Sequence, residues 1–252
     1  MKIMVLGSSG AEFPGHNPPA FLLDEILLLD AGTIGSMLVA EQQERIRHIC
    51  VTHSHLDHIR GIPALADNIV ICGRNQSVNV ISISEVLAVL KEHLMNGQVW
   101  PDFTVIPAPD AAAVTYQEIV PEQEVILDGF SITACRVNHS VPAVGYIVRK
   151  GDKSLLYTGD SGPTDRIWRL AGSLSAMIIE VSFPNEMENM ALLTGHMTSR
   201  LLRKELSKMK TLPPRIFITH LKPQFGEIIA AELAALGLPQ IELLQDGVTY
   251  EL

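Results

Sequence analysis

The sequence has few cysteines, few aromatic residues and no long apolar run. Only three of its 252 residues are cysteines, and Cys50, Cys72 and Cys135 form no CxxC pair. An odd number of scattered thiols argues against a disulfide framework and predicts three buried, small apolar side chains. No apolar run approaches the roughly 18 residues of a membrane span. The first residues predict a β-strand and not a signal peptide, so we expect a cytoplasmic protein.

Basic residues are also fewer than acidic ones. The chain has 19 Lys and Arg against 28 Asp and Glu, a net charge of −9. This charge disfavours non-specific attachment to nucleic acid or anionic lipid, and it makes RNA a less favoured substrate. Aromatic residues make up 5%, so the core must be mainly aliphatic. The apolar share of 47% is that of a globular protein, and we expect one domain over residues 1–252.

Short aliphatic runs alternate with helical stretches along the whole chain. Strands are expected at 2–6, 20–23, 26–29, 48–52, 70–72, 114–119, 124–127, 131–137, 144–148, 154–158, 176–181, 215–219, 241–244 and 248–252. Helices are expected at 35–47, 56–67, 84–96, 196–209 and 224–235. Asp24-Glu25 predicts one hairpin turn, and Asp246-Gly247 should join the last two strands in another. Two strand-rich halves that each carry helices predict two sheets face to face with helices outside.

Three histidines and an aspartate fall within six residues, just after a predicted strand: His53, His55, Asp57 and His58. In an extended segment residues two apart point the same way, so His53 and His55 can bind one ion. If the chain then turns into a helix, Asp57 and His58 project toward a neighbouring ion, while Leu56 faces the core. Imidazole and carboxylate ligands suit Zn²⁺, and also Fe or Mn. The alternatives are a polar loop with accidental histidines and a purely structural metal site.

Further candidate ligands follow the carboxyl ends of three other aliphatic strands, where active sites of open sheets gather: His139, Asp160 and His220. Taken singly, each is more often a cap or a turn residue. Together with the first cluster they make seven candidates, which one ion with an open position cannot use. The count fits two ions, the first held by His53, His55 and His139, the second by Asp57, His58 and His220, and both bridged by Asp160. Two cations about 3.5–4 Å apart can share a hydroxide and clamp the oxygens of a displacement reaction.

The segment Thr52-His53-Ser54-His55-Leu56-Asp57-His58, with Asp30-Ala31-Gly32 before it and His139, Asp160 and His220 after it, resembles the metallo-β-lactamase superfamily. These markers span nearly the whole chain in the expected order. The resemblance implies a mixed α/β (α+β) fold, a four-layer αββα sandwich with a binuclear site in the cleft between two βα halves. It also implies that Asp30 orients a ligand or a loop, where the plain alternative is a turn aspartate.

Two further segments, Ile179-Glu180-Val181-Ser182-Phe183-Pro184 and Gly195-His196-Met197-Thr198, resemble phosphodiesterase branches of that superfamily, including the tRNA 3′-processing endonucleases. By this resemblance Glu180 would orient His196, and His196 would act as a general acid or contact a phosphate. The alternative for His196 is simply the start of a helix, whose N-terminus would itself suit a phosphate.

Leu56 and three segments resemble class II 3′,5′-cyclic-nucleotide phosphodiesterases: His58-Ile59-Arg60-Gly61-Ile62, Glu180-Val181-Ser182-Phe183-Pro184 and Thr219-His220-Leu221-Lys222-Pro223. Pro63 departs from that pattern, which usually continues with aliphatic residues. The tRNA-processing group generally carries Gly at the position of Leu56 and often adds a flexible basic arm, which has no counterpart here.

These patterns lead us to expect a binuclear metal-dependent phosphodiesterase that cleaves a 3′,5′-cyclic nucleotide (cAMP or cGMP) or a similar small diester with a metal-bridging hydroxide. Asp57, His196 and Glu180 are the expected catalytic residues, and two divalent transition-metal ions, Zn²⁺ before Mn or Fe, are the expected cofactors. We expect a small-molecule substrate and no membrane partner, and leave a homodimer open. The alternatives are a tRNA-processing RNA hydrolase, a lactonase or other ester hydrolase, a non-catalytic metal-binding scaffold, and a di-iron redox protein. The last commonly carries an acidic ligand at the position of His55.

Overall fold

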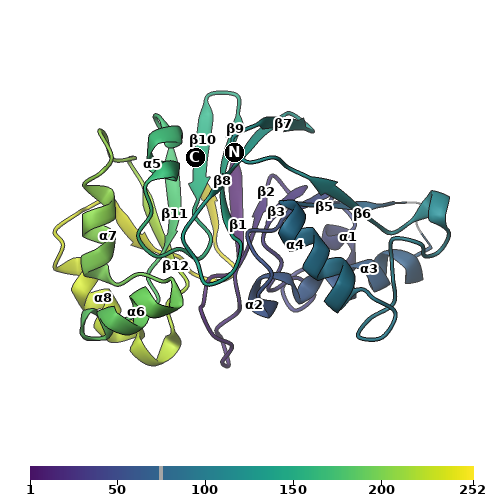
Figure 1. Ribbon diagram of the computed structural model, residues 1–252, viewed down its shortest axis with the longest axis horizontal. Coiled ribbons are helices and arrows are strands. Elements are labelled where there is room, and N and C mark those ends of the chain that lie inside the picture. Colours follow the sequence, from purple (N-terminus) through teal and green to yellow (C-terminus); the bar gives the residue numbers. More distant parts are fainter. Residues whose placement is uncertain (74–75) are drawn as a thin grey trace.

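Two β-sheets lie face to face at the centre of the molecule. The computed structural model describes residues 1–73 and 76–252, and within these ranges the strands form two seven-stranded sheets. Figure 1 shows one group of helices on the outer side of each sheet, α5 to α8 on the left and α1, α3 and α4 on the right. The predicted four-layer αββα sandwich is therefore confirmed.

The first sheet contains both ends of the chain. Its strands, in spatial order, are β14 (Thr249–Glu251), β1 (Lys2–Gly7), β2 (Ala20–Leu23), β3 (Leu27–Leu29), β4 (His48–Cys50), β5 (Val78–Ser82) and β6 (Val114–Glu118). From β3 to β6 the pairs are parallel, as in sheets that are covered on both faces. The predicted hairpin turn joins β2 to β3, with positive φ at Asp24 (45°) and Glu25 (66°).

The second sheet is built from the middle and the late part of the chain. In spatial order it contains β13 (Ile241–Leu243), β12 (Ile216–Thr219), β11 (Ala176–Glu180), β10 (Lys153–Tyr157), β9 (Val144–Lys150), β8 (Phe130–Arg136) and β7 (Glu124–Leu127). Strands β10 to β13 pair in parallel, so their carboxyl ends meet at one edge of the sheet. Because β8 and β10 are both antiparallel to β9, the end of β8 reaches the same edge.

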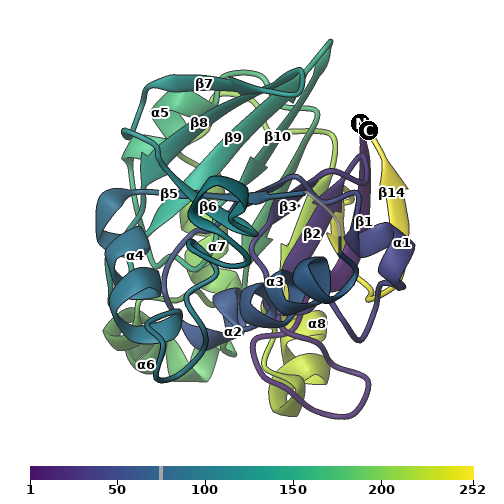
Figure 2. The ribbon, with the colours of Figure 1, turned by 90° about the vertical axis from the view of Figure 1, so that its right-hand side faces the viewer.

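The helices are short and, except for α2, which carries two of the candidate ligands, lie on the outer faces (Figure 2). They are α1 (Ala40–Gln43), α2 (Leu56–Ile59), α3 (Gly61–Ile71), α4 (Ser84–Val89), which continues as a π-helix over Leu90–Leu94, α5 (Arg166–Ala171), α6 (Glu188–Thr194), α7 (Ser199–Leu206) and α8 (Gly226–Ala234). One large apolar cluster fills the space between the sheets and extends to α3 and α4 on the outer side of the first sheet, and a second lies between the second sheet and α5, α7 and α8. No helix in the described ranges is long and apolar enough to cross a membrane.

The predicted hairpin at the end of the chain is wrong. Strand β13 pairs with β12 in the second sheet, whereas β14 pairs antiparallel with β1 in the first. The turn at Asp246-Gly247 therefore carries the chain from one sheet to the other. Burial explains the separation, because Tyr250 packs between the sheets with its ring centroid 4.9 Å from that of Phe217. That burial removes apolar surface from water, which a free hairpin would leave exposed.

Three other elements differ from expectation. The predicted strand at 70–72 is the last turn of α3, and β5, which was not predicted, fills the place between β4 and β6. A run of two or three apolar residues does not distinguish a strand from the end of a helix. The expected helix at 35–47 shrinks to the single turn α1. Cys72 is exposed at the end of α3, against the expectation of three buried thiols.

The helix predicted at 196–209 begins later and ends earlier than expected, and a separate helix precedes it. Gly195, in the left-handed region with φ of 72°, ends α6, which the sequence did not reveal. Helix α7 begins only at Ser199, where the hydroxyl of Thr198 accepts a hydrogen bond from the backbone N–H of Leu201 at 3.3 Å. His196 therefore lies between two helices and is not the first residue of one.

Candidate metal centre

The seven candidate ligands converge at the carboxyl ends of β4, β8, β10 and β12. Two overlapping groups form there, and within each group the ligand atoms all lie within 4.8 Å of one another. One group contains His53, His55, His139 and Asp160, and the other contains Asp57, His58, His220 and Asp160. The structure thus brings the residues together in the two sets expected from the sequence, with Asp160 common to both.

Asp160 lies between the two sets. Its Oδ2 is 3.2 Å from Nε2 of His220, 3.4 Å from Nε2 of His58 and 3.7 Å from Nε2 of His53. Its carboxylate is almost fully buried. Burial alone would raise the pKa of Asp160, but the surrounding imidazoles outweigh it and hold the pKa well below its usual range. An ionised carboxylate at this point faces ligands of both groups.

Hydrogen bonds on the far side of each ring aim the histidines at the site. The Nδ1–H of His139 donates to the carbonyl oxygen of Gly195 at 2.9 Å, which leaves Nε2 unprotonated and facing His55. The hydroxyl of Thr52 donates to Asp30, so it can only accept from Nδ1–H of His53, at 3.0 Å. The bare Nε2 atoms of both rings are therefore directed into the cluster, as metal ligation requires.

Asp30 organises the first sheet's side of the site. Its Oδ1 accepts from the backbone N–H of Thr52 at 2.7 Å. Its Oδ2 accepts from Nδ1–H of His58 at 2.7 Å and from the hydroxyl of Tyr157 at 2.6 Å. This geometry agrees with the orienting role that the resemblance implied for Asp30. The contribution of Tyr157 was missed, because it comes from β10 in the opposite sheet.

Two residues at the site have backbone conformations that residues other than glycine rarely adopt. Asp30 has φ of 57° and His220 has φ of 64°. Such conformations cost on the order of 1–3 kcal/mol each and persist where the surroundings hold them. The backbone N–H of His220 donates to the carbonyl oxygen of Ser8 at 2.6 Å, which holds this strained residue against β1. Strained backbone at two residues of one site is typical of a functional site.

The donor set fits divalent transition metals. The Nε2 atoms of His53 and His58 are buried and have no hydrogen-bond partner within the described ranges. A buried polar nitrogen without a partner costs about 1–3 kcal/mol, and a metal ion would remove that cost. The seven residues offer imidazole nitrogen and carboxylate oxygen and no sulfur, a combination that suits Zn²⁺, Fe or Mn.

The pKa values support the same interpretation. Burial and the neighbouring imidazoles lower the pKa of His53 and His55, which keeps both neutral, as ligands must be. Burial also acts to lower the pKa of His58, but Asp160 and Asp30 outweigh it and raise that pKa well above its usual value. The two carboxylates thus favour positive charge at His58, and a cation bound at its Nε2 would supply that charge in place of a proton.

Glu180 and His196 form a pair beside the cluster. Nδ1–H of His196 donates to Oε1 of the fully buried Glu180 at 2.8 Å. The His196 ring centroid is 5.1 Å from that of His139 and 5.3 Å from that of His220. Burial lowers the pKa of His196, but Glu180 and then Asp160 outweigh it and raise the pKa to about 9. Without bound metal His196 is therefore protonated at neutral pH, and with Nδ1 engaged by Glu180 it can donate from Nε2.

Gly195 leaves no room for a side chain beside His139. A Cβ there would lie 2.9 Å from Cα and 3.0 Å from Nδ1 of His139, on a backbone with φ of 72°. We expect Gly195→Ala to lower the free energy of unfolding by about 1–3 kcal/mol and to weaken metal binding at the first group, because His139 must move. The matched control is Gly237→Ala, since Gly237 also has positive φ (67°) but has nothing within 4 Å of the added Cβ. Denaturant unfolding and metal titration of both variants test this; equal metal affinity in the two would contradict it.

Leu56 does not face the core, contrary to expectation. Its side chain is 66% exposed, whereas His58 and Ile59 occupy the buried positions of α2. A single helical turn of four residues can bury only one of its sides. In α2 the buried side carries His58, whose ring contacts Asp30 and the ligand cluster. Leu56 is thus an apolar surface next to the ligand Asp57.

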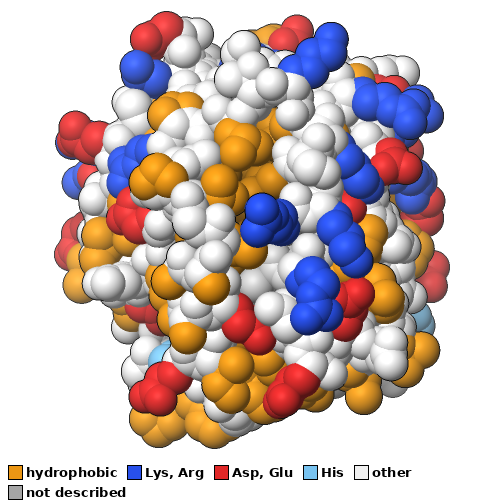
Figure 3. Space-filling model, turned by 90° about the vertical axis from the view of Figure 1, so that its left-hand side faces the viewer, with side chains coloured by type: hydrophobic (Ala, Val, Ile, Leu, Met, Phe, Trp, Pro, Cys, Tyr) orange, Lys and Arg blue, Asp and Glu red, His pale blue; other side chains and the backbone are white. Residues whose placement is uncertain are grey.

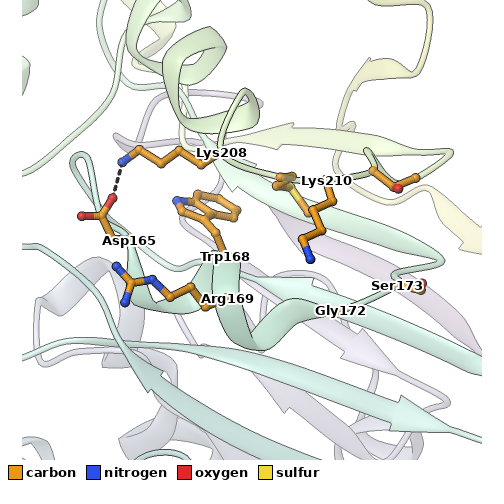
Figure 4. Close-up of a pocket in the computed structure, with 9 residues that line it drawn as sticks. Asp165, Trp168, Arg169, Gly172, Ser173, Lys208 and Lys210 are labelled. Atoms are coloured by element: carbon orange, nitrogen blue, oxygen red, sulfur yellow. Dashed lines mark hydrogen bonds and ion pairs between the residues drawn. The ribbon is translucent and has the colours of Figure 1, made fainter.

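A cavity of about 740 Å³ lies away from this cluster, between α5 and the end of α7 (Figure 4). Among its lining residues are Trp168, Arg169, Lys208 and Lys210, and none of the lining residues is a candidate ligand. Lys208 is already bound by Asp165 at 2.7 Å and by Glu205 at 2.8 Å. The cavity therefore contributes no chemistry to the metal centre.

Sequence comparison relates this chain to the superfamily that its motifs resemble. A family model described as a beta-lactamase superfamily domain matches residues 27–221. A probable 3′,5′-cyclic-nucleotide phosphodiesterase of Yersinia pestis is 29% identical over 214 residues, which cover 73% of this chain and 60% of that protein. A ribonuclease Z of Archaeoglobus fulgidus is 25% identical over 285 residues, which cover 90% of this chain and 89% of that protein. The chain therefore spans less than two thirds of the first relative and most of the second.

A solved structure shares the whole architecture. The metallo-beta-lactamase fold protein YhfI of Bacillus subtilis superposes with a TM-score of 0.79 at 17% identity, over 99% of this chain and 98% of that one. At this identity the likeness concerns the fold alone.

Proposed function

The chain belongs to the beta-lactamase superfamily, as the resemblance of its motifs predicted, and from this premise we propose that it is a binuclear metal-dependent phosphodiesterase. Its substrate would be a small phosphodiester such as a 3′,5′-cyclic nucleotide. The observation that carries the proposal is the pair of ligand groups sharing Asp160, with the Glu180–His196 pair beside them. The cyclic-nucleotide phosphodiesterase relative supports the choice of substrate class.

The proposed ligands divide as the two groups do. His53, His55 and His139 would hold one divalent ion, Asp57, His58 and His220 would hold the other, and Asp160 would bridge them. Zn²⁺ is the ion we favour, with Mn or Fe as alternatives. Bound there, two such ions would activate water as the nucleophile and stabilise negative charge on the phosphoryl oxygens.

The chain's own residues would position the diester and supply a proton. His196 would protonate the leaving oxygen from Nε2, since its Nδ1–H is engaged by Glu180. The buried carboxylate of Glu180 keeps the ring charged and oriented. A protonated imidazole beside the cluster would also attract the anionic phosphate before reaction.

Surface features favour a small substrate. Leu56, 66% exposed, directly precedes the proposed ligand Asp57. An apolar side chain at this point suits the flat face of a nucleobase. On the face that carries α7 and α8, basic side chains are interspersed with acidic ones (Figure 3). There Arg200 pairs with Glu188 at 3.1 Å, which reduces its attraction for an RNA backbone.

An RNA hydrolase of the ribonuclease Z kind is the second candidate. It is favoured by similarity to several ribonucleases Z, two of which match this chain over 89% and 88% of their own length. The net charge of −9 disfavours this candidate, because a negatively charged protein repels the RNA backbone.

A substrate panel on the metal-loaded protein separates the candidates. We expect cleavage of cyclic AMP or cyclic GMP and of an aryl phosphodiester, with no cleavage of a lactone or a β-lactam. Metal analysis of the same sample should find about two ions per chain. Cleavage confined to pre-tRNA would support the second candidate, and cleavage confined to the lactone would overturn both.

A further inference from the structure

Ser182 lies where the Glu180–His196 pair meets the ligand His220. It follows β11 by two residues and is fully buried. Its Oγ is 2.6 Å from Oε2 of Glu180, 2.8 Å from Nδ1 of His220 and 3.4 Å from Nδ1 of His196. Glu180, His196 and His220 also form a third group of ligand type, and the Ser182 hydroxyl contacts all three.

The direction of these hydrogen bonds follows from counting protons. Ser182 has a single hydroxyl hydrogen, and Glu180, when ionised, can only accept. The shortest contact is the one to Oε2 of Glu180, so the hydrogen lies there, and the 3.1 Å contact to the carbonyl oxygen of His220 is secondary. Ser182 Oγ must then accept from Nδ1–H of His220.

This assignment decides which nitrogen of His220 is free. A neutral imidazole with its proton on Nδ1 has a bare Nε2. That Nε2 lies 3.2 Å from Oδ2 of Asp160 and 3.4 Å from Oδ2 of Asp57, which is the ligand position of the second group. Without Ser182, the buried His220 would lose the partner that selects this tautomer.

We propose that Ser182 is a positioning residue that fixes the tautomer and ring orientation of His220 for the second ion and ties that ligand to the proton-donating pair. The proposal rests on the binuclear site of the proposed function. Hydrogen bonds run from Nδ1–H of His220 to Ser182, from Ser182 to Glu180, and from Nδ1–H of His196 to the same carboxylate. An ion that withdraws electron density from His220 strengthens the first of these bonds and polarises the next.

The effect of Ser182 should be confined to one ion. In the first group, His139 is held by Gly195 and His53 by Thr52, and neither hydrogen bond involves Ser182. In the second group His58 is held by Asp30. Removing the Ser182 hydroxyl therefore releases one ligand of the second ion and none of the first.

The test is a metal titration of the metal-free protein, and this titration needs no substrate. Zn²⁺ is added in competition with a chromophoric chelator, and Co²⁺ absorption reports the ligand geometry. We expect wild type to bind two ions, and Ser182→Ala to bind the first as wild type and the second about 10–100-fold more weakly. Ser182→Thr, which keeps the hydroxyl, should restore the second affinity. The matched control is Ser199→Ala, because Ser199 is buried and its hydroxyl has no hydrogen-bond partner in the described chain; it should bind as wild type.

Equal affinity for the second ion in wild type and Ser182→Ala would overturn the proposal, as would equal weakening of both ions. Circular dichroism establishes that each variant is folded, and Ser182→Gly replaces Ser182→Ala if the latter does not fold. A wild type that binds only one ion would remove the premise. Failure of the phosphodiesterase assignment would instead appear in the wild-type substrate panel, with the titration unchanged.

Discussion

Asp160→Ala is expected to reduce phosphodiester hydrolysis by about 10³-fold or more, because it removes the one carboxylate that both ligand groups share. Metal content should fall from about two ions per chain to one or fewer. The fold should remain, since the second sheet and the apolar cluster between the sheets do not depend on this side chain. Steady-state kinetics, metal analysis and circular dichroism of the variant measure the three quantities.

The matched control for that variant is Asp165→Ala. Asp165 is an exposed aspartate that binds Lys208 at 2.7 Å, outside both ligand groups. Its replacement should leave activity and metal content unchanged. Full activity of Asp160→Ala would rule out the binuclear scheme, whatever the metal content proves to be.

His196→Gln is expected to lower kcat for a cyclic nucleotide by about 10²–10⁴-fold while leaving about two ions bound. The reason is that His196 lies outside the proposed ligand sets and serves to protonate the leaving oxygen. An aryl diester with a nitrophenolate leaving group needs little protonation, so its hydrolysis should fall much less. This difference between substrates distinguishes a proton donor from a residue that merely supports the site.

Glu180→Gln should act in the same direction but less strongly, because it removes the charge that holds the His196 proton and keeps the shape of the side chain. The control is His93→Ala, at an exposed histidine of the π-helical segment. If His196→Gln reduces cleavage of the cyclic nucleotide and the aryl diester by the same factor, His196 is not the general acid. Loss of metal from that variant would also contradict this role.

Much of the site was predictable because its ligands are marked locally. His53, His55 and His58 are close in sequence, and each later candidate directly follows an aliphatic strand, so strand ends alone indicated where they would gather. The turn at Asp24-Glu25 was predictable for the same reason, since turn residues act within a few positions. That the gathered residues bind two metal ions is still a prediction.

The sequence could not reveal contacts between residues distant along the chain. Tyr157 reaches Asp30 from the opposite sheet, and nothing local to Tyr157 marks that contact. Ser182 stands in a segment whose importance was visible, but its partner His220 is 38 positions away. Leu56 was placed in the core by its apolar character alone, whereas the burial of His58 decided the orientation of α2.

By itself, then, the sequence determined the layered α/β architecture and the candidate ligands, which follow from periodicity, strand ends and spacing, all properties of neighbouring residues. The pairing of Glu180 with His196 was implied only by the resemblance of their two segments to phosphodiesterases. Only the tertiary structure decided the assignment of β13 and β14 to different sheets, the exposure of Leu56, and the hydrogen bonds that choose each histidine's tautomer. Those depend on which surfaces are buried against each other, and burial is a property of the folded chain as a whole.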